Sequence, residues 1–299
     1  MKGDLDMLLG AVDIGTNSTR LLIAKMEKGQ VVPVVQRLQA TRLGQGMSEK
    51  SYLGAEPAER TLRALRGFQR LMRESGVERA RAVATSAVRE ALNGREFVQE
   101  AEAVLGFPVH VVTGEQEAVL SYRGATGAIP EITFPVVVDI GGGSTEITYQ
   151  NERGRIIPVS LPLGAVRCTE QGWPENKIQS VLRDGLHPLA RRQLGLVGVG
   201  GTITTLAAVD LGLEFYDWKK VHKYRLTYER ILDILKYLAA LPLEERKRVP
   251  GLQPERADII VAGTIILKEL MRLLNTEFIT VSEADILHGI ILELYQQQI

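Results

Sequence analysis

The chain has 299 residues, of which 45% are hydrophobic and 24% charged, a globular composition long enough for two domains. Lys plus Arg and Asp plus Glu both total 36, so a general basic surface for duplex nucleic acid or anionic membrane is excluded. The single cysteine excludes an intrachain disulfide and favours a cytoplasmic protein. The first residues are acidic where a signal peptide is basic, and no stretch reaches the ~18 apolar residues of a membrane span, so we expect neither.

One phrase occurs twice in the chain. Residues 11–20 read AVDIGTNSTR and residues 136–146 read VVVDIGGGSTE. Placing Asp13 on Asp139 also matches the isoleucine, glycine, serine and threonine that follow, and the strand–turn–strand pattern of 21–34 then matches that of 147–159. Chance recurrence of a short motif is the alternative, but the matching flanks favour internal duplication.

The remaining elements alternate between strands and helices. In chain order, strands are predicted at 21–26, 31–34, 80–84, 109–113, 147–150 and 156–159, and a strand with a glycine turn at 196–201. Helices are predicted from Ser86 and at 115–127, 202–211, 228–241, 255–274 and 284–297. This mixture predicts an α/β fold. The repeat and nearby Gly and Pro residues place the domain boundary between residues 1–123 and 124–299, and the last helix is expected to pack back on the first domain.

Each copy of the phrase is a strand that ends in Asp and turns through Gly and hydroxyl residues. Such turns expose backbone N–H groups to which phosphate oxygens can bind. We therefore expect phosphate to bind Thr16, Asn17 and Ser18 in the first turn and Gly141, Gly142, Gly143 and Ser144 in the second. An ordinary flexible turn is the alternative for the three glycines.

Several strings along the chain resemble one family. They are DIGTNSTRLLI, TRLGQG, ATSAVREALN, TGEQEA, DIGGGSTE, SLPLGAVR, GVGGTITTLAA and PGLQPERADII, in this order from residue 13 to residue 260. Together they resemble the exopolyphosphatase/guanosine pentaphosphate phosphohydrolase family, Ppx/GppA, in its short two-domain form. The resemblance implies two duplicated actin-like (ribonuclease H-like) domains with an interdomain cleft, within the superfamily of actin, Hsp70 and the sugar kinases.

Two residues are expected to be catalytic. Glu117 lies in the first turn of a helix that follows a strand, where open α/β sheets bind ligands. The resemblance implies that Glu117 takes a proton from the attacking water, whereas the alternative is a carboxylate stabilised by the helix dipole. The resemblance also implies that Arg89 binds phosphate and offsets developing charge; a solvated arginine is the alternative.

Three acids are candidate metal ligands. Asp139 and Glu146 flank the second turn, which brings together two hard oxygen donors of the kind that Mg²⁺ prefers. Asp13 is the equivalent donor in the first turn, but Arg20 stands where Glu146 would be, so one metal site is favoured over two. Turn capping is the alternative for an Asp at a strand end. Arg42 and Arg167 are further candidates for binding phosphate.

Taken with these residues, the resemblance implies an exopolyphosphatase that hydrolyses the terminal phosphate of inorganic polyphosphate with Mg²⁺ or another divalent cation. Guanosine pentaphosphate is the alternative substrate, and base binding at the glycine turn of residues 198–205 would favour it. An ATP-dependent sugar-kinase-type enzyme and a silent nucleotide sensor are the more distant alternatives. The expected partners are either substrate and a second copy of the chain, with no membrane and no duplex nucleic acid.

Overall fold

The computed structural model describes residues 7–47, 51–186 and 195–297. The chain divides into a first unit, residues 1–128 with 284–299, and a second unit, residues 129–283. The predicted boundary after residue 123 differs from this division because α5 (Gly114–Ala128) continues through it. Gly124 lies inside that helix, and a side chain there would collide with the backbone of Asp285. The last helix belongs to the first unit.

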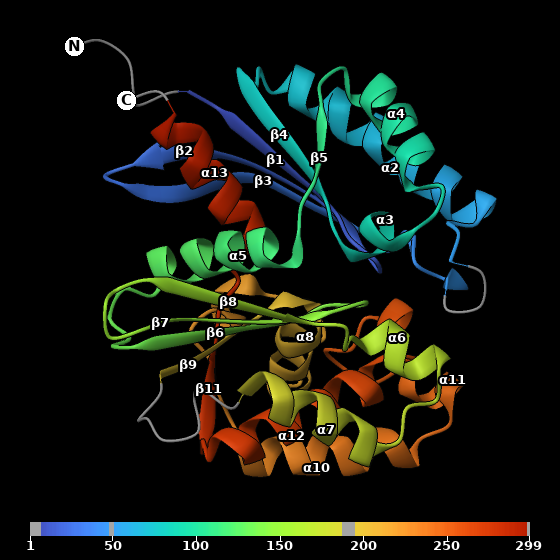
Figure 1. The fold of residues 1–299 in the computed structure, drawn as a ribbon, viewed down its shortest axis with the longest axis vertical. Helices are drawn as coiled ribbons and strands as arrows, with labels where there is room; N and C mark the ends of the chain where they lie inside the picture. The colour runs from blue at the N-terminus through green and yellow to red at the C-terminus, as the bar shows by residue number, and fades with distance from the viewer. Residues whose placement is uncertain (1–6, 48–50, 187–194, 298–299) are drawn as a thin grey trace. The chain divides into compact units, whose positions relative to one another are not determined.

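The first unit is a mixed sheet with helices on both faces (Figure 1). The strands lie in the order β3-β2-β1-β4-β5, with β1 antiparallel to β2 and parallel to β4. Their bounds are β1 (Leu9–Ile14), β2 (Thr19–Glu27), β3 (Gln30–Gln39), β4 (Arg79–Ala84) and β5 (Val109–Val111). Besides α5, the helices are α2 (Ala55–Glu74), α3 (Ser86–Glu90), α4 (Gly94–Leu105) and α13 (Ile286–Gln296).

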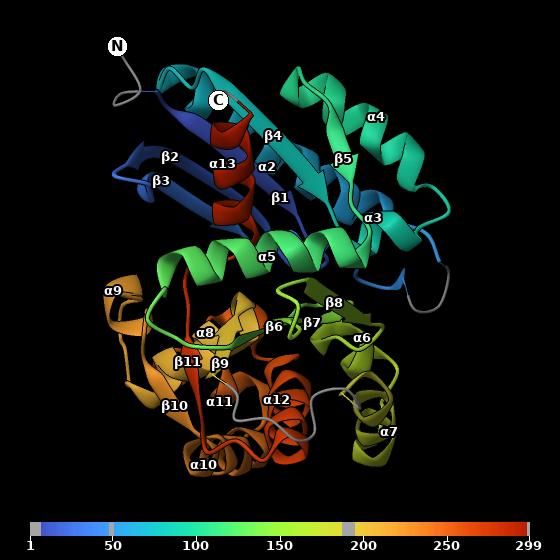
Figure 2. The same ribbon diagram turned by 60° about the vertical axis from the view of Figure 1, so that its left-hand side comes forward.

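Alternating side chains of β1 separate two cores. Val12 and Ile14 pack with α2, α3 and α4, whereas Leu9 and Ala11 pack with α5 and α13. Because successive strand residues point to opposite faces, Asp13 lies on the face covered by α13. Figures 1 and 2 show α13, drawn in red, against this face of the sheet.

The second unit repeats the plan with added elements. Its sheet has the order β10-β11-β9-β6-β7-β8. The strands are β6 (Pro135–Ile140), β7 (Thr145–Gln150), β8 (Ile156–Leu161), β9 (Gly195–Val199), β10 (Arg225–Thr227) and β11 (Phe278–Val281). The helices are α6 (Ala165–Glu170), α7 (Glu175–Leu186), α8 (Gly200–Asp210), α9 (Trp218–Val221), α10 (Tyr228–Ala240), α11 (Leu243–Arg246), the 3-10 helix η2 (Pro254–Arg256) and α12 (Ile260–Leu274).

The two sheets share one strand order. Reading β3-β2-β1-β4-β5 against β8-β7-β6-β9-β11 matches an antiparallel hairpin followed by parallel strands in both units. The largest apolar core joins Val136, Val138 and Ile147 of the second sheet to residues of α7, α8, α10 and α12. The predicted α/β fold with a duplicated unit is confirmed.

One predicted helix is shorter than expected. The pattern over 255–274 predicts a continuous helix, but α12 begins at Ile260 and η2 precedes it. Pro254 opens that 3-10 turn, and the buried Arg256 belongs to it rather than to a regular helix face. Within the described part of the chain, no helix is long and apolar enough to cross a membrane.

Candidate active site

The two hairpins pair their residues in matching registers. Asp13 lies opposite Arg20 across the β1–β2 ladder, and Asp139 lies opposite Glu146 across the β6–β7 ladder. Cross-strand partners share one face of a sheet, with Cβ atoms about 4.5–5.5 Å apart. The repeated phrase therefore becomes a repeated geometry with one change of charge, from arginine in the first unit to glutamate in the second.

Asp139 and Glu146 bring two carboxylates to one face of the second sheet. Glu146 is 2% exposed, and its Oε1 accepts a hydrogen bond of 2.8 Å from the Ser160 hydroxyl. Asp139 packs against Gly200, whose positive φ of 84° and missing side chain allow the close approach. Among the described residues, no group of three His, Cys, Asp or Glu side chains forms a metal cluster. The pair suits Mg²⁺, which is usually bound by one or two carboxylates together with waters and substrate phosphates.

The first turn contains buried donors without partners. The Gly15 N–H donates to the Ser18 carbonyl at 3.0 Å and closes the turn. Within the described structure, Asn17 Nδ2 and Ser18 Oγ are buried and have no hydrogen-bond partner. Because an unpaired buried polar group is costly, such groups in a native protein need an explanation such as an absent ligand. The chemistry of both groups suits the phosphate oxygens predicted to bind here.

Arg42 belongs to a loop that packs on this first turn. Its N–H donates to the Asn17 carbonyl at 2.8 Å, and the Gly44 N–H donates to the Thr16 carbonyl at 2.8 Å. Arg42 adopts a left-handed φ of 50°, which is strained for a residue with a Cβ atom. The contacts hold the backbone of Arg42 beside the predicted phosphate-binding residues.

The second turn is closed and supported in a similar way. The Gly141 N–H donates to the Ser144 carbonyl at 2.9 Å, which repeats the bond in the first turn. The carbonyl of Gly142 accepts the N–H groups of Val166 and Arg167, and the carbonyl of Gly143 accepts Arg167 Nε at 2.8 Å. Arg167 therefore lies against the predicted phosphate-binding turn.

Glu117 and Arg89 meet in the first unit. Arg89 Nη1 lies 3.1 Å from Glu117 Oε2 and 2.8 Å from the Val112 carbonyl oxygen. The side chains of Arg89 and Glu117 are 23% and 13% exposed, so both remain accessible to a ligand. Residues that are 28 positions apart thus form one charged pair, next to the N-terminus of α5.

Asp13 is bound by a guanidinium. Arg20 Nε and Nη2 donate to Asp13 Oδ2 at 2.9 and 2.7 Å, and Arg20 Nη1 donates to Asp285 Oδ2. Burial is the largest influence on the Asp13 pKa and raises it, although Arg20 opposes the shift. In the first hairpin a cation from the chain itself therefore occupies the neighbourhood of the predicted metal ligand.

Arg256 and Asp285 were not predicted as site residues. Arg256 is buried, and its guanidinium packs so closely on Gly201, at the start of α8, that a side chain there would collide with it. It therefore lies near Gly200, which touches Asp139. The contacts of both residues depend on packing between distant segments. The only sequence signal was that Arg256 stands in the family-like string PGLQPERADII.

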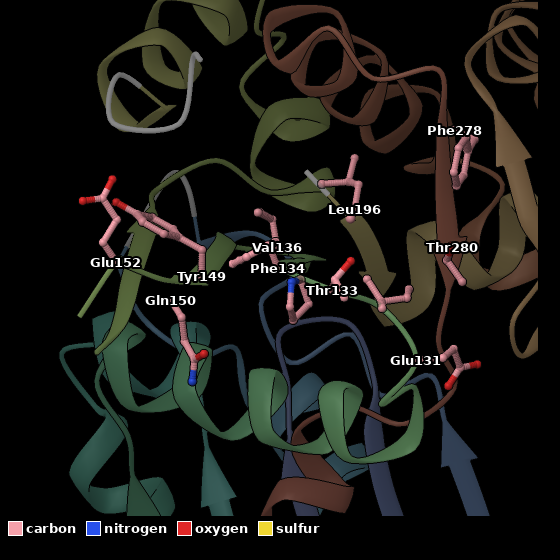
Figure 3. A pocket seen from close by; sticks show the side chains of 13 residues that line it. Glu131, Thr133, Phe134, Val136, Tyr149, Gln150, Glu152, Leu196, Phe278 and Thr280 are labelled. Carbon is pink, nitrogen blue, oxygen red and sulfur yellow. The ribbon is translucent and has the colours of Figure 1, made fainter. Parts of the chain in front are cut away.

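A pocket of about 710 Å³ lies elsewhere in the second unit (Figure 3). It is at the amino ends of β6 and β9, whereas Asp139 lies near the carboxyl end of β6. Figure 3 shows Glu152 and Tyr149 on one side of it and Glu131 on the other. None of the residues that line this pocket is a predicted site residue, so the pocket is separate from the candidate site.

The duplicated sheets and their matching turns define a two-unit, actin-like α/β protein. The chain belongs to the Ppx/GppA phosphatase family, whose model matches residues 22–298. It is 36% identical to Exopolyphosphatase 2 of Mycobacterium tuberculosis (strain H37Rv), over 96% of this chain and 98% of that protein. It is 32% identical to the bifunctional 3-dehydroquinate synthase/phosphatase of Fusobacterium nucleatum, over 96% of this chain but only 46% of that protein.

A solved structure supports the same fold. The crystal structure of the Aquifex aeolicus Ppx/GppA family member has a TM-score of 0.81 with this chain. The two are 31% identical, and the match covers 98% of each chain. The predicted family is therefore confirmed.

Proposed function

We propose that this protein is an exopolyphosphatase, which hydrolyses the terminal phosphoanhydride of inorganic polyphosphate. The choice of polyphosphate as substrate is supported by the similarity to Exopolyphosphatase 2 over 98% of that protein. Polyphosphate is a chain of phosphoanhydrides. Its hydrolysis therefore requires groups that bind phosphate and a carboxylate that acts as a base on the attacking water.

In this proposal the first unit supplies the base and phosphate donors. Glu117 accepts a proton from the attacking water, and Arg89, held 3.1 Å from it, binds the transferred phosphoryl group. Asn17 and Ser18 donate their unpaired N–H and O–H groups to phosphate oxygens, with Thr16 and Arg42 beside them. Such catalysis consists mainly of positioning and electrostatic stabilisation.

The second unit supplies the divalent cation site and further donors. Asp139 and Glu146 would hold Mg²⁺, which supplies charge neutralisation to the phosphate oxygens when bound. Gly142, Gly143 and Ser144, which follow Gly141 in the turn, offer N–H groups to phosphate, together with Arg167. Asp13 is the weaker candidate ligand because its Oδ2 accepts two hydrogen bonds from Arg20.

Guanosine pentaphosphate is the second candidate substrate. The glycine turn at Gly200 and Gly201 begins an α-helix, and the buried Arg256 packs on it, so an anion or a nucleotide could be recognised there. Both substrates present a terminal phosphoanhydride to the same residues. We also propose that the protein is cytoplasmic and that it forms a homodimer. Light scattering of the purified protein tests the dimer.

The deciding experiment is phosphate release by the purified protein with Mg²⁺. Long-chain polyphosphate and guanosine pentaphosphate are compared at equal concentrations of terminal groups, with Glu117→Gln as the blank. We expect faster release from polyphosphate, lost in the variant. Faster release from the nucleotide would move the function to the second candidate, and no release from either would overturn both.

A further inference from the structure

Arg20 joins two carboxylates that are distant in sequence. It binds Asp13 through two nitrogens and Asp285, 265 residues away, through the third. The side chains of Asp13 and Asp285 are 7% and 6% exposed, so both ion pairs are largely removed from solvent. Removing one partner of such a pair leaves a buried charge uncompensated, which is strongly unfavourable.

Asp285 is also the N-cap residue of α13. Its Oδ1 accepts the N–H of Leu287 at 3.1 Å and caps the helix, while Oδ2 accepts from Arg20. Its backbone carbonyl lies against Gly124 of α5, where any larger side chain would collide with it. A single residue therefore touches the first hairpin, the start of α13 and the middle of α5.

These three elements carry the proposed chemistry of the first unit. The hairpin holds the turn with Asn17 and Ser18, and α5 holds Glu117 near its N-terminus. The chain also leaves the first unit after Ala128, at the end of α5, and re-enters it at Ala284, one residue before Asp285. Asp285 therefore contacts both the hairpin of the predicted phosphate turn and the helix of the proposed base.

The contact between Asp285 and Arg20 is an ion pair as well as a hydrogen bond. An arginine side chain is always charged in a protein, so Arg20 presents a full positive charge to both carboxylates. An asparagine at 285 could still cap α13, because Asn is a good N-cap residue. When its single amide oxygen caps the helix, its NH2 group faces Arg20, so the variant keeps the cap but loses both the ion pair and the hydrogen bond to Arg20.

We propose that Asp285 is a positioning residue of the active site, which acts through Arg20 to hold the first phosphate-binding turn in register with α5 and Glu117. This inference rests on the proposed function. Asp285 itself does not contact substrate. Its effect is on where Asn17 and Ser18 stand relative to the proposed base.

The test compares Asp285→Asn with Glu293→Gln. Glu293 is also on α13 and accepts Arg123 Nη1 at 2.7 Å and Arg81 Nη1 at 2.8 Å, so its variant breaks two ion pairs of the same helix away from the turn. With folded protein quantified by thermal denaturation, we expect Asp285→Asn to lower kcat/KM for polyphosphate about tenfold with a higher KM. Glu293→Gln should leave KM unchanged.

The KM distinguishes positioning from a general loss of structure. Partial unfolding lowers kcat but does not change KM, so an unchanged KM in Asp285→Asn would overturn the proposal. A lower KM would also overturn it, because it would mean that Asp285 merely repels the anionic substrate. If Asp285→Asn is poorly folded, Asp285→Glu is the second variant to test. It keeps the negative charge, so it should recover part of the kcat/KM that Asp285→Asn loses.

Hydrogen exchange gives a readout that does not depend on activity. The amides of residues 14–18 should exchange faster in Asp285→Asn than in wild type, and at the wild-type rate in Glu293→Gln. Unchanged exchange in Asp285→Asn would overturn the positioning role even if the wild-type protein released no phosphate. Failure of phosphate release by the wild type would instead overturn the proposed function.

Discussion

Glu146 lies directly opposite Asp139 across the β6–β7 ladder, so two carboxylates share one face of the second sheet. The matching pair in the first sheet joins Asp13 to Arg20 and is already an ion pair. The duplicated hairpins therefore differ in their need for an added cation. The second is the one that we propose binds a cation from solution, whereas in the first Arg20 already pairs with Asp13.

Glu146→Gln is expected to raise the Mg²⁺ concentration that gives half-maximal phosphate release. The substitution keeps the size of the side chain but removes one of two anionic donors. The rise should be at least about tenfold, since loss of even an outer-shell partner of a metal costs roughly 10- to 100-fold in affinity or activity. Titrating Mg²⁺ into metal-free protein in a phosphate-release assay measures it.

Glu152→Gln is the control for this metal prediction. Glu152 is an exposed acid in the turn after β7 and lines the separate pocket. Its variant should keep the wild-type Mg²⁺ dependence. An identical Mg²⁺ dependence in Glu146→Gln and wild type would remove Glu146 from the proposed metal site.

Ser18→Ala is expected to reduce activity without reducing stability. Ser18 Oγ is buried and has no hydrogen-bond partner within the described structure, so its removal costs the folded protein no hydrogen bond. A hydrogen bond to a charged phosphate contributes about 1.5–3 kcal/mol, so kcat/KM should fall roughly 10- to 100-fold. Urea denaturation and phosphate release measure the two effects.

Thr19→Val, at the neighbouring residue, is the control and is expected to reduce stability. The Thr19 and Thr41 hydroxyls form a buried hydrogen bond of 2.8 Å, and valine would leave Thr41 without it. This variant should lose about 1–3 kcal/mol of unfolding free energy. If Ser18→Ala were instead the destabilised variant, the Ser18 hydroxyl would form a hydrogen bond that stabilises the fold. That result would exclude the proposed phosphate binding by Ser18.

The hairpins could be predicted from the sequence because each is local. Strand, turn and strand follow one another within about twenty residues, so the position of Asp13 opposite Arg20 depends on the turn between them. The pairing of Arg89 with Glu117 joins separate helices. The family resemblance predicted a catalytic role for each residue, but the contact between them was not predicted.

The contacts of Asp285 and Arg256 could not be predicted. Asp285 meets Arg20 only because α13 returns to the face of β1. Arg256 reaches Gly201 because η2 replaces the start of the expected helix at 255. Hydrophobic periodicity identifies which face of an element is buried, but not which distant element covers it.

Arg42→Gly and Arg42→Ala are expected to differ in stability but not in activity. The left-handed φ of 50° at this position strains any residue with a Cβ atom, and glycine adopts it freely. Arg42→Gly should therefore be about 1 kcal/mol more stable than Arg42→Ala in urea denaturation. Both lack the guanidinium, so both should show the same raised KM for polyphosphate. A wild-type KM in either variant would exclude phosphate binding by Arg42.

Cys168→Ala is expected to change how stability depends on alkaline pH. Burial raises the pKa of the Cys168 thiol from 9.0 to about 11. Between these values the unfolded chain loses the thiol proton before the folded protein does, so the free energy of unfolding falls as pH rises, by up to about 1.4 kcal/mol per pH unit. Below pH 9 the thiol is protonated in both states and contributes no slope.

Urea denaturation at several values from pH 8 to about pH 11 measures this effect. Tyrosines and lysines also titrate in this range, but they are the same in both proteins, so the difference between wild type and Cys168→Ala isolates the thiol. The variant should lose less stability than wild type as pH rises from 9 to 11, and it should keep phosphate release, because a buried protonated thiol is a poor nucleophile. Parallel stability curves would show that the thiol ionises as easily in the folded protein as in the unfolded chain. Loss of phosphate release would indicate that Cys168 takes part in the reaction.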